Sequence, residues 1–253
     1  MLTAFLLSHS DFGDEFPNCE VTGTDISPSQ PVWVPPNVRF EVDDASKSWT
    51  FQENHFDYVH IRWLTGTIRD WPALYKEAFR CTKPGGWIEH VDADAKIHCL
   101  DGTMPDDSAF GQWGAIWKAV GGFIGTEFDL PSSGIMEKGL EEAGFINVEC
   151  QDLVVRPPLI SGLPKYFETD TDIQIPLSPW AKDPKMKQLG LYNLAAMTHD
   201  IEGFLSYLMP TYLGWTEKDI ANYAATARKE YKEGKIHANI RWRIVKAQKP
   251  LDA

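Results

Sequence analysis

The chain has 253 residues, of which 43% are hydrophobic and 24% are charged, so it is long enough for one sizeable core and has the composition of a globular protein. Its formal net charge of −12 argues against nucleic acid as a partner, because binding to phosphates relies on lysine and arginine. No apolar stretch approaches the roughly 18 residues of a membrane span, so no membrane partner is expected.

The cysteines and the N-terminal residues bear on the compartment. Cys19, Cys81, Cys99 and Cys150 are widely spaced and form no metal-ligand pattern with histidine. This usage is typical of free thiols in a reducing compartment, and no metal site is expected. The apolar run 2–7 has no basic residue before it and is too short for the core of a signal peptide. We therefore expect a cytoplasmic protein.

The first part of the chain reads as strands that alternate with helices and loops. Apolar residues at near-helical spacing predict a helix over 3–16, with a short strand at 2–7 as the alternative. Strands are predicted over 20–25, 38–42, 56–62 and 87–91. Four prolines make 27–37 an extended loop, a helix runs from Pro72 to about Thr82, and 83–86 forms a turn. The alternation indicates a parallel sheet with helices on its faces.

The later part of the chain adds helices and an elaborate cap. The predicted helices are 107–122, 133–143, 185–208 and 217–232, and the predicted strands are 145–155 and 236–246. Residues 156–184 carry six prolines and are expected to form a long loop or lid. We predict a single domain over 1–253, in which 101–130 and 156–235 are cap or lid insertions.

Five motifs stand out along the chain: GTDISP, WVPPNVRFEVDDA, FDYVHIR, IRDWPALYKEAFRCTKPGGWIEH and EKGLEEAGFINVE. In this order they resemble class I S-adenosylmethionine-dependent methyltransferases, and in particular the LaeA-like methyltransferases of filamentous fungi. The resemblance covers residues 11–155 well and the rest loosely. It implies an α/β fold with a Rossmann-like sheet, parallel except for an antiparallel last strand, and a cofactor bound over the carboxyl ends of the first strands.

The resemblance also assigns roles to single residues. Asp25 matches the acid that accepts hydrogen bonds from the cofactor ribose, and Asp44 matches the residue that binds the adenine amine. His60 and Arg62 leave the strand where the cofactor and substrate pockets of that family meet. Each has a structural alternative: Asp25 as a turn cap, Asp44 as half of a solvated pair with Asp43, and His60 as a core histidine. Arg62, if buried, demands an anionic or carbonyl partner.

One part of the family pattern is missing. Family members begin with a strand and a GxGxG loop, and the residues at that place, 2–6, contain no glycine. Glycine is needed there because the backbone turns tightly and approaches the methionine part of the cofactor without a Cβ between them. We therefore predict an N-terminally truncated, incomplete sheet of about six strands without the first strand. The gap favours re-pairing, a replacement segment or a second subunit, and we expect a homodimer.

Three functions remain open. The first is a cofactor-independent cyclase or isomerase of the pericyclase type that acts on an apolar small-molecule intermediate of fungal secondary metabolism. Its candidate catalytic residues lie on or beyond the carboxyl ends of two strands: Arg62, His60, His90, Asp92 and His98. The alternative is an active methyltransferase that binds S-adenosylmethionine through Asp25 and Asp44. The third is a non-catalytic LaeA-like partner protein.

Overall fold

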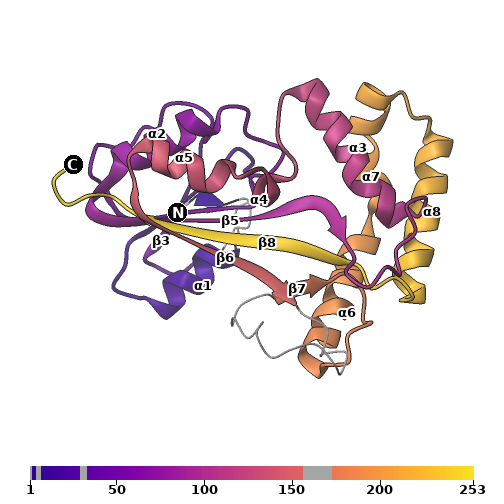
Figure 1. Ribbon diagram of the computed structural model, residues 1–253. Helices are drawn as coiled ribbons and strands as arrows, with labels where there is room; N and C mark the ends of the chain where they lie inside the picture. Colours follow the sequence, from indigo (N-terminus) through magenta and orange to yellow (C-terminus); the bar gives the residue numbers. More distant parts are fainter. Residues whose placement is uncertain (1, 4–6, 29–32, 156–172) are drawn as a thin grey trace. The chain divides into compact units, whose positions relative to one another are not determined.

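A computed structural model describes residues 2–3, 7–28, 33–155 and 173–253 (Figure 1). The chain divides into two compact units. The first comprises Met1–Asp92, Ser133–Gln151 and Arg243–Ala253, and the second comprises Ala93–Ser132 and Asp152–Trp242. The predicted cap segments 101–130 and 156–235 belong to the second unit, apart from 156–172, which lie outside the described residues.

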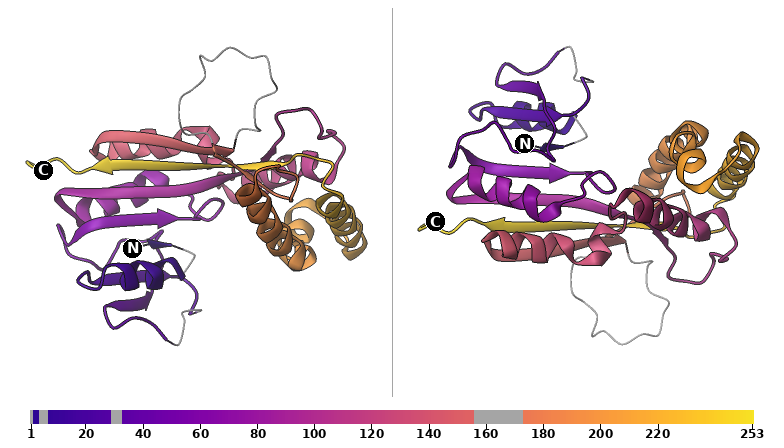
Figure 2. Two further views of the ribbon diagram at one scale, coloured as in Figure 1. Left: turned by 90° about the horizontal axis from the view of Figure 1, so that it is seen from below. Right: turned by 90° about the horizontal axis from the view of Figure 1, so that it is seen from above.

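The sheet confirms the predicted α/β fold class. Its strands are β1 (Leu2–Thr3), β2 (Val21–Asp25), β3 (Val38–Val42), β4 (Phe56–Arg62), β5 (Thr82–His98), β6 (Ile146–Val155), β7 (Ile173–Pro176) and β8 (Asn239–Gln248). Their order is β3-β2-β1-β4-β5-β8-β6-β7, and the pairs from β3 to β5 are parallel. Figure 2 shows β8 running against the parallel strands, as the resemblance implies.

The prediction that the first strand is absent is wrong. Leu2 pairs in parallel with Thr24 of β2 and with Ile61 of β4, and Thr3 pairs with Arg62. Residues 2–3 therefore occupy the place between β2 and β4, and the described residues form a sheet of eight strands rather than six. The helix predicted over 3–16 is α1 (Leu7–Glu15), so both alternatives for this segment hold in part.

The first unit contains a cavity at the amino ends of β2 and β4. A cavity of about 570 Å³ is lined by Val21 and Thr22 of β2, by Phe56 and Tyr58 of β4, and by Phe12 of α1, among others. These residues lie at the amino ends of the two strands, whereas β1 pairs with their carboxyl ends. A strand of two residues is too short to cover the full length of its neighbours.

The helices of the first unit lie on both faces of its sheet (Figure 1). α1 lies on one face, and α2 (Trp71–Cys81) and α5 (Ile135–Ala143) pack together on the other. Asp70 caps α2 by accepting a hydrogen bond from the N–H of Ala73 at 2.9 Å, and the proline at the start of the helix needs no such partner. Gly144 ends α5 as its C-cap, with φ of 107°.

The turn predicted at 83–86 is a bulge inside β5. Phe56 pairs with Thr82 and Tyr58 pairs with Trp87, so the four residues 83–86 of β5 lie opposite the single residue Asp57 of β4. Gly85 has φ of 77°, which a residue with a Cβ adopts only with strain. The proline and glycines therefore interrupt the pairing, and β5 continues on both sides of them.

The second unit contains a strand that the sequence did not predict. β7 lies inside the region predicted as a loop, and it pairs antiparallel with Val154 and Val155 of β6 and with β8 through Ile175 and Pro176. The helix predicted over 185–208 is broken into α6 (Pro184–His199) and α7 (Ile201–Leu205). Asp200 causes the break, because its side chain caps α7 by accepting from the N–H of Gly203 at 2.8 Å.

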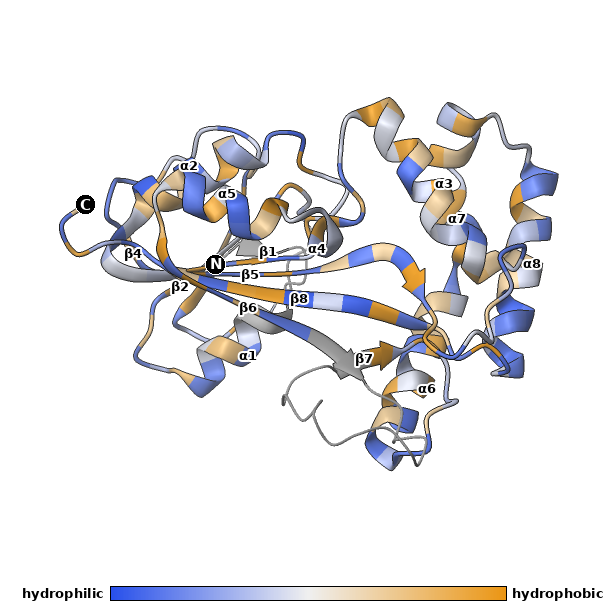
Figure 3. Ribbon diagram, viewed as in Figure 1, coloured by the Kyte–Doolittle hydropathy of each residue, from blue (hydrophilic) through white to orange (hydrophobic). Residues whose placement is uncertain are grey.

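Helices with one apolar side build the core of the second unit. The helices are α3 (Ala109–Ile124), α4 (Leu130–Ser133), α6, α7, the π-helical turn Met209–Leu213 and α8 (Glu217–Glu233). Figure 3 shows polar and apolar residues along α8, whose buried residues include Ile220, Ala224 and Ala227. Thr216 and Asp219 form a capping box at the start of α8. In the described part of the chain, no helix has the length and apolar character of a membrane span.

Candidate functional site

A cavity of about 530 Å³ lies in the first unit, within the size range of small-molecule sites. Three loops line it, each following the carboxyl end of a parallel strand: 24–26 after β2, 43–47 after β3, and Trp63, Leu64 and 67–70 after β4. Sheets of this topology bind ligands at this edge, because the loops there converge between neighbouring strands. The cavity is therefore the candidate site.

Asp25 is the last residue of β2 and lines the cavity. Its Oδ1 accepts a hydrogen bond from the N–H of Ser27 at 2.8 Å, and its backbone carbonyl accepts from the N–H of Asp43 at 3.0 Å. The first bond holds the carboxylate at the carboxyl end of β2, and the second connects the backbone of Asp25 to the loop after β3. A carboxylate in this place can accept hydrogen bonds from ligand hydroxyls.

Asp44 lines the same cavity from the loop after β3. Its Oδ1 accepts from the hydroxyl of Ser46 at 2.6 Å and from the N–H of Ser46 at 2.9 Å. These hydrogen bonds lower the pKa of the carboxyl of Asp44, so it is ionised at neutral pH. The structure thus brings together both residues that the resemblance assigns to cofactor binding. Ser46 fixes Asp44, and the sequence analysis did not single it out.

The third wall of the cavity was also missed. Trp63, Leu64, Thr67 and Arg69 come from the segment WLTGTIRD between β4 and α2. Its position directly after a buried strand is the signal that could have identified it, since loops at this edge of a parallel sheet carry functional residues.

The cavity holds the carboxylates Asp25, Asp43, Asp44 and Asp70 against two basic residues, Lys47 and Arg69. This balance favours a ligand that is cationic or rich in hydrogen-bond donors.

Two of the predicted catalytic residues lie on β4, outside the cavity lining. His60 is 7% exposed, and its Nδ1 lies 3.0 Å from Oε1 of Glu89 on β5. The register places Arg62 between Thr3 of β1 and Val91 of β5. Their contact with a substrate stays a prediction.

His90 and Asp92 are fully buried on β5. Oδ2 of Asp92 accepts hydrogen bonds from the N–H groups of Leu64 and Thr65, at 2.9 and 3.0 Å, and lies 3.3 Å from Nε2 of His90. Nδ1 of His90 lies 2.8 Å from the hydroxyl of Tyr75 on α2. The structure thus places both residues behind the wall formed by the β4–α2 loop.

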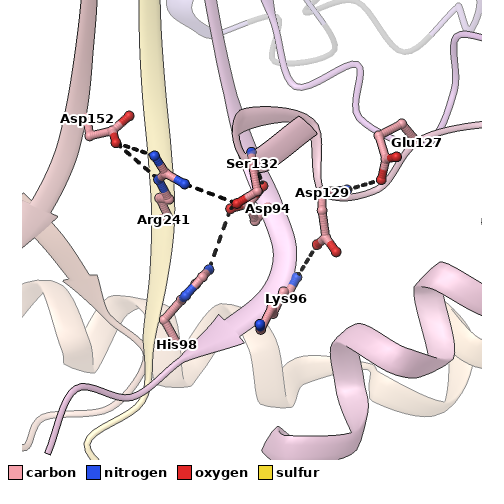
Figure 4. A network of polar contacts seen from close by, with 8 residues as sticks. All are labelled: Asp94, Lys96, His98, Glu127, Asp129, Ser132, Asp152 and Arg241. Atoms are coloured by element: carbon pink, nitrogen blue, oxygen red, sulfur yellow. Dashed lines mark hydrogen bonds and ion pairs between the residues drawn. The ribbon is translucent and has the colours of Figure 1, made fainter. Parts of the chain in front are cut away.

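His98, the fifth predicted catalytic residue, belongs to the second unit and takes part in a network there (Figure 4). Its Nε2 lies 3.5 Å from Oδ2 of Asp94, which is 1% exposed. Asp94 also accepts from the N–H of Ser132 at 3.0 Å and from its hydroxyl at 2.6 Å. Arg241 donates to the Ser132 hydroxyl at 3.1 Å and pairs with Asp152. The network ties β5, β8 and α4 together.

No metal centre is formed by the residues that the structure describes. Among them, no three His, Cys, Asp or Glu side chains are placed to hold an ion together.

The second unit contains a cluster of aromatic rings. Trp113 stacks with Phe204 and with Tyr223, and the ring centroids are 6.1 and 6.2 Å apart. Such rings can pack against an apolar ligand.

Glu89, the partner of His60, should make the stability of the first unit depend on pH. Burial raises its pKa, but hydrogen bonds from His60, Lys246 and Tyr58 outweigh burial and lower the pKa from 4.5 to about 2. Because the folded pKa is the lower one, the stabilisation is complete above pH 4.5 and is lost as the pH falls towards 2. We expect Glu89→Gln to cost roughly 2 kcal/mol at pH 6 and less at pH 3.

Urea unfolding at successive pH values tests this expectation. The matched control is Glu142→Gln, because Glu142 is 57% exposed on α5 and its pair with Lys138 contributes little. If Glu89→Gln and the wild type differ by the same free energy of unfolding at pH 6 and pH 3, the proposed electrostatic role of Glu89 is wrong.

Comparisons with known proteins agree with this geometry. The model of the methyltransferase domain family matches residues 7–151. The chain is 32% identical to the methyltransferase pytC of Aspergillus terreus over 239 residues, which are 94% of this chain and 67% of that protein. It is 28% identical to the secondary metabolism regulator LAE1 of Cochliobolus heterostrophus over 246 residues, 95% of this chain and 72% of that protein.

Among solved structures, the [4+2]-cyclase SpnF has a similar fold. The TM-score is 0.52 with 14% sequence identity, covering 99% of this chain and 74% of that one. At this identity the likeness concerns the fold alone. The family model spans more than half of this chain, and the match to pytC covers 94% of this chain. The chain belongs to the methyltransferase domain family.

Proposed function

We propose that the chain is an S-adenosylmethionine-dependent methyltransferase of fungal secondary metabolism that acts on an apolar small molecule. The observation that carries the proposal is the shared cavity: Asp25 and Asp44 follow neighbouring strands and line the same 530 Å³ space. The similarity to a fungal methyltransferase and to a fungal regulator of secondary metabolism supports the biological setting.

The residues of the cavity fit the adenosine half of this cofactor. The carboxylate of Asp25 would accept hydrogen bonds from the ribose hydroxyls, and Asp44, ionised and fixed by Ser46, would accept one from the adenine amine. Trp63, which is 38% exposed, and Leu64 offer apolar surface for the adenine ring. When bound, the cofactor supplies an electrophilic methyl group on a cationic sulfur, and the excess of carboxylates in the cavity suits that charge.

One observation favours a second candidate, the cofactor-independent cyclase or isomerase. The residues between β1 and α1 are Ala4-Phe5-Leu6, and none is a glycine. The resemblance leads us to expect glycine at this place, where the backbone of family members approaches the methionine half of the cofactor. In this case Arg62, His60 or His98 would orient or polarise an apolar substrate, and Asp25 would have no ribose to bind.

Calorimetric titration with S-adenosylmethionine separates the two candidates. The methyltransferase proposal expects one binding site per chain, with dissociation in the micromolar range and comparable affinity for S-adenosylhomocysteine. Absence of binding up to about 1 mM of both ligands would refute it and favour the cyclase. Binding of S-adenosylhomocysteine without any methyl transfer would favour the third function, a regulatory partner protein.

A further inference from the structure

The turn that follows β4 has a strained backbone. Trp63 has φ of 60°, in the left-handed region that a bulky side chain rarely adopts. Trp63 and Leu64 line the candidate cofactor cavity, so the strain lies in its wall. Such a conformation persists only where the surrounding contacts fix it.

The contacts that fix this turn come from the end of the buried part of β5. The N–H of Trp63 donates to the carbonyl of Val91 at 3.2 Å. The next two N–H groups, of Leu64 and Thr65, both donate to Oδ2 of Asp92, at 2.9 and 3.0 Å. Three successive amides are therefore held by two successive residues, and hydrogen bonds to a buried carboxylate are among the stronger ones.

Asp92 lies against the buried side chain of His90, which in turn contacts the buried side chain of Tyr75. The hydroxyl of Tyr75 lies 2.8 Å from Nδ1 of His90, and Nε2 of His90 lies 3.3 Å from Oδ2 of Asp92. Burial, reinforced by the charges of Asp92 and Glu137, raises the pKa of Tyr75 well above its ordinary value. Because a carboxylate only accepts hydrogen bonds, the ring proton of His90 is assigned to Nε2, which faces Asp92, and Nδ1 then accepts the hydrogen bond from the Tyr75 hydroxyl. The ring of Trp71 stacks on His90 with centroids 5.1 Å apart.

We propose that Tyr75, His90 and Asp92 form a relay of positioning residues that holds the Trp63–Leu64–Thr65 turn in the shape the cofactor requires. All three side chains are fully buried, and none is among the residues that line the cavity. They are therefore placed to act on the wall rather than on a substrate. The inference rests on the proposed cofactor site, but the link from Tyr75 to the turn can be tested without any ligand.

The first variant is Tyr75→Phe, which keeps the ring and removes only the hydroxyl. Nδ1 of His90 then either remains buried without a donor or takes the ring proton, which removes the Nε2–H from Asp92. We expect the amides of Leu64 and Thr65 to exchange with solvent faster by about fivefold, and the affinity for S-adenosylmethionine to fall by a similar factor. Hydrogen exchange of the ligand-free protein and calorimetry measure the two effects separately.

The matched control is Thr82→Val. The hydroxyl of Thr82 is equally buried and donates to the carbonyl of Ala78 at 2.7 Å, but Thr82 begins β5, whereas the turn contacts Val91 and Asp92 further along that strand. It should lower stability without changing exchange at residues 63–65 or cofactor affinity. A purely structural role for Tyr75 would make the two variants indistinguishable.

A second variant, Asp92→Asn, keeps the side-chain shape and one acceptor oxygen but removes the negative charge. We expect the amides of Leu64 and Thr65 to exchange about tenfold faster than in the wild type, which is a larger effect than that of Tyr75→Phe. If both variants leave these amides as protected as in the wild type, the relay is wrong, whatever the cofactor measurement shows. If the wild type does not bind the cofactor but the amides respond as expected, the relay stands and the proposed function fails.

Discussion

Replacing Asp25 with alanine is expected to lower the affinity for S-adenosylmethionine at least about tenfold and to leave the fold intact. Hydrogen bonds to a carboxylate contribute about 1.5–3 kcal/mol each, and 1.4 kcal/mol corresponds to a factor of ten in affinity. Asp25 is partly exposed, and its described side-chain bond is a local one to Ser27, so little of the folded structure depends on it. Calorimetry gives the affinity, and circular dichroism checks the fold.

Two further variants make the result specific. Asp44→Ala should also weaken binding, but it should in addition release Ser46, whose N–H and hydroxyl both donate to Oδ1. Asp14→Ala, which removes an exposed acid of α1, changes the net charge by the same amount and should leave the affinity unchanged. Equal losses in all three variants would mean that net charge, and not the cavity, governs binding.

Asp25→Ala also separates the two candidate functions, the methyltransferase and the cyclase. A cofactor-independent cyclase has no ribose to hold, so Asp25→Ala would leave its turnover nearly unchanged, whereas Arg62→Ala would lower it strongly. A methyltransferase loses cofactor binding and turnover together in Asp25→Ala. If Asp25→Ala and Arg62→Ala reduce turnover to the same degree, the cyclase is excluded.

The strands with strong local patterns could be predicted from the sequence, and those that depend on partners could not. β3 and β4 begin and end where the sequence predicts. β4 has an apolar run that is buried at its centre, and in β3 apolar residues alternate with charged ones. β1 has two residues and β7 has four, too few for a periodicity to be recognised. Both are strands only because neighbouring strands pair with them.

The candidate site was predicted only where a motif marks it. Asp25 ends β2 and Asp44 lies in the loop after β3, so their convergence follows from parallel topology. His90 and Asp92 lie on β5 and are fully buried. Whether the end of a strand opens into a cavity or is covered depends on elements distant in the chain, here the loop at 63–65 and Tyr75 of α2. The sequence of β5 alone does not contain that information.

Replacing Asp94 with alanine is expected to destabilise the second unit by about 3 kcal/mol. Asp94 is 1% exposed, and both of its oxygens accept from Ser132. Without it, the N–H and hydroxyl of Ser132 lose the buried carboxylate that accepts from them, and His98 loses the carboxylate at 3.5 Å. Hydrogen bonds to a charged group contribute about 1.5–3 kcal/mol each, which is why the effect exceeds that of an ordinary surface ion pair.

Urea unfolding followed by tryptophan fluorescence measures this loss, since Trp117 is 3% exposed in the core of the second unit. The control is Asp152→Ala in the same network (Figure 4). Asp152 pairs with Arg241, but both side chains keep about a quarter of their surface exposed, so water replaces the lost partner and the cost should stay below about 1 kcal/mol. Equal losses for Asp94→Ala and Asp152→Ala would show that burial does not set the strength of this network. A larger loss for Asp94→Ala, with faster hydrogen exchange at Ser132, would identify Asp94 as the residue that holds α4 against β5.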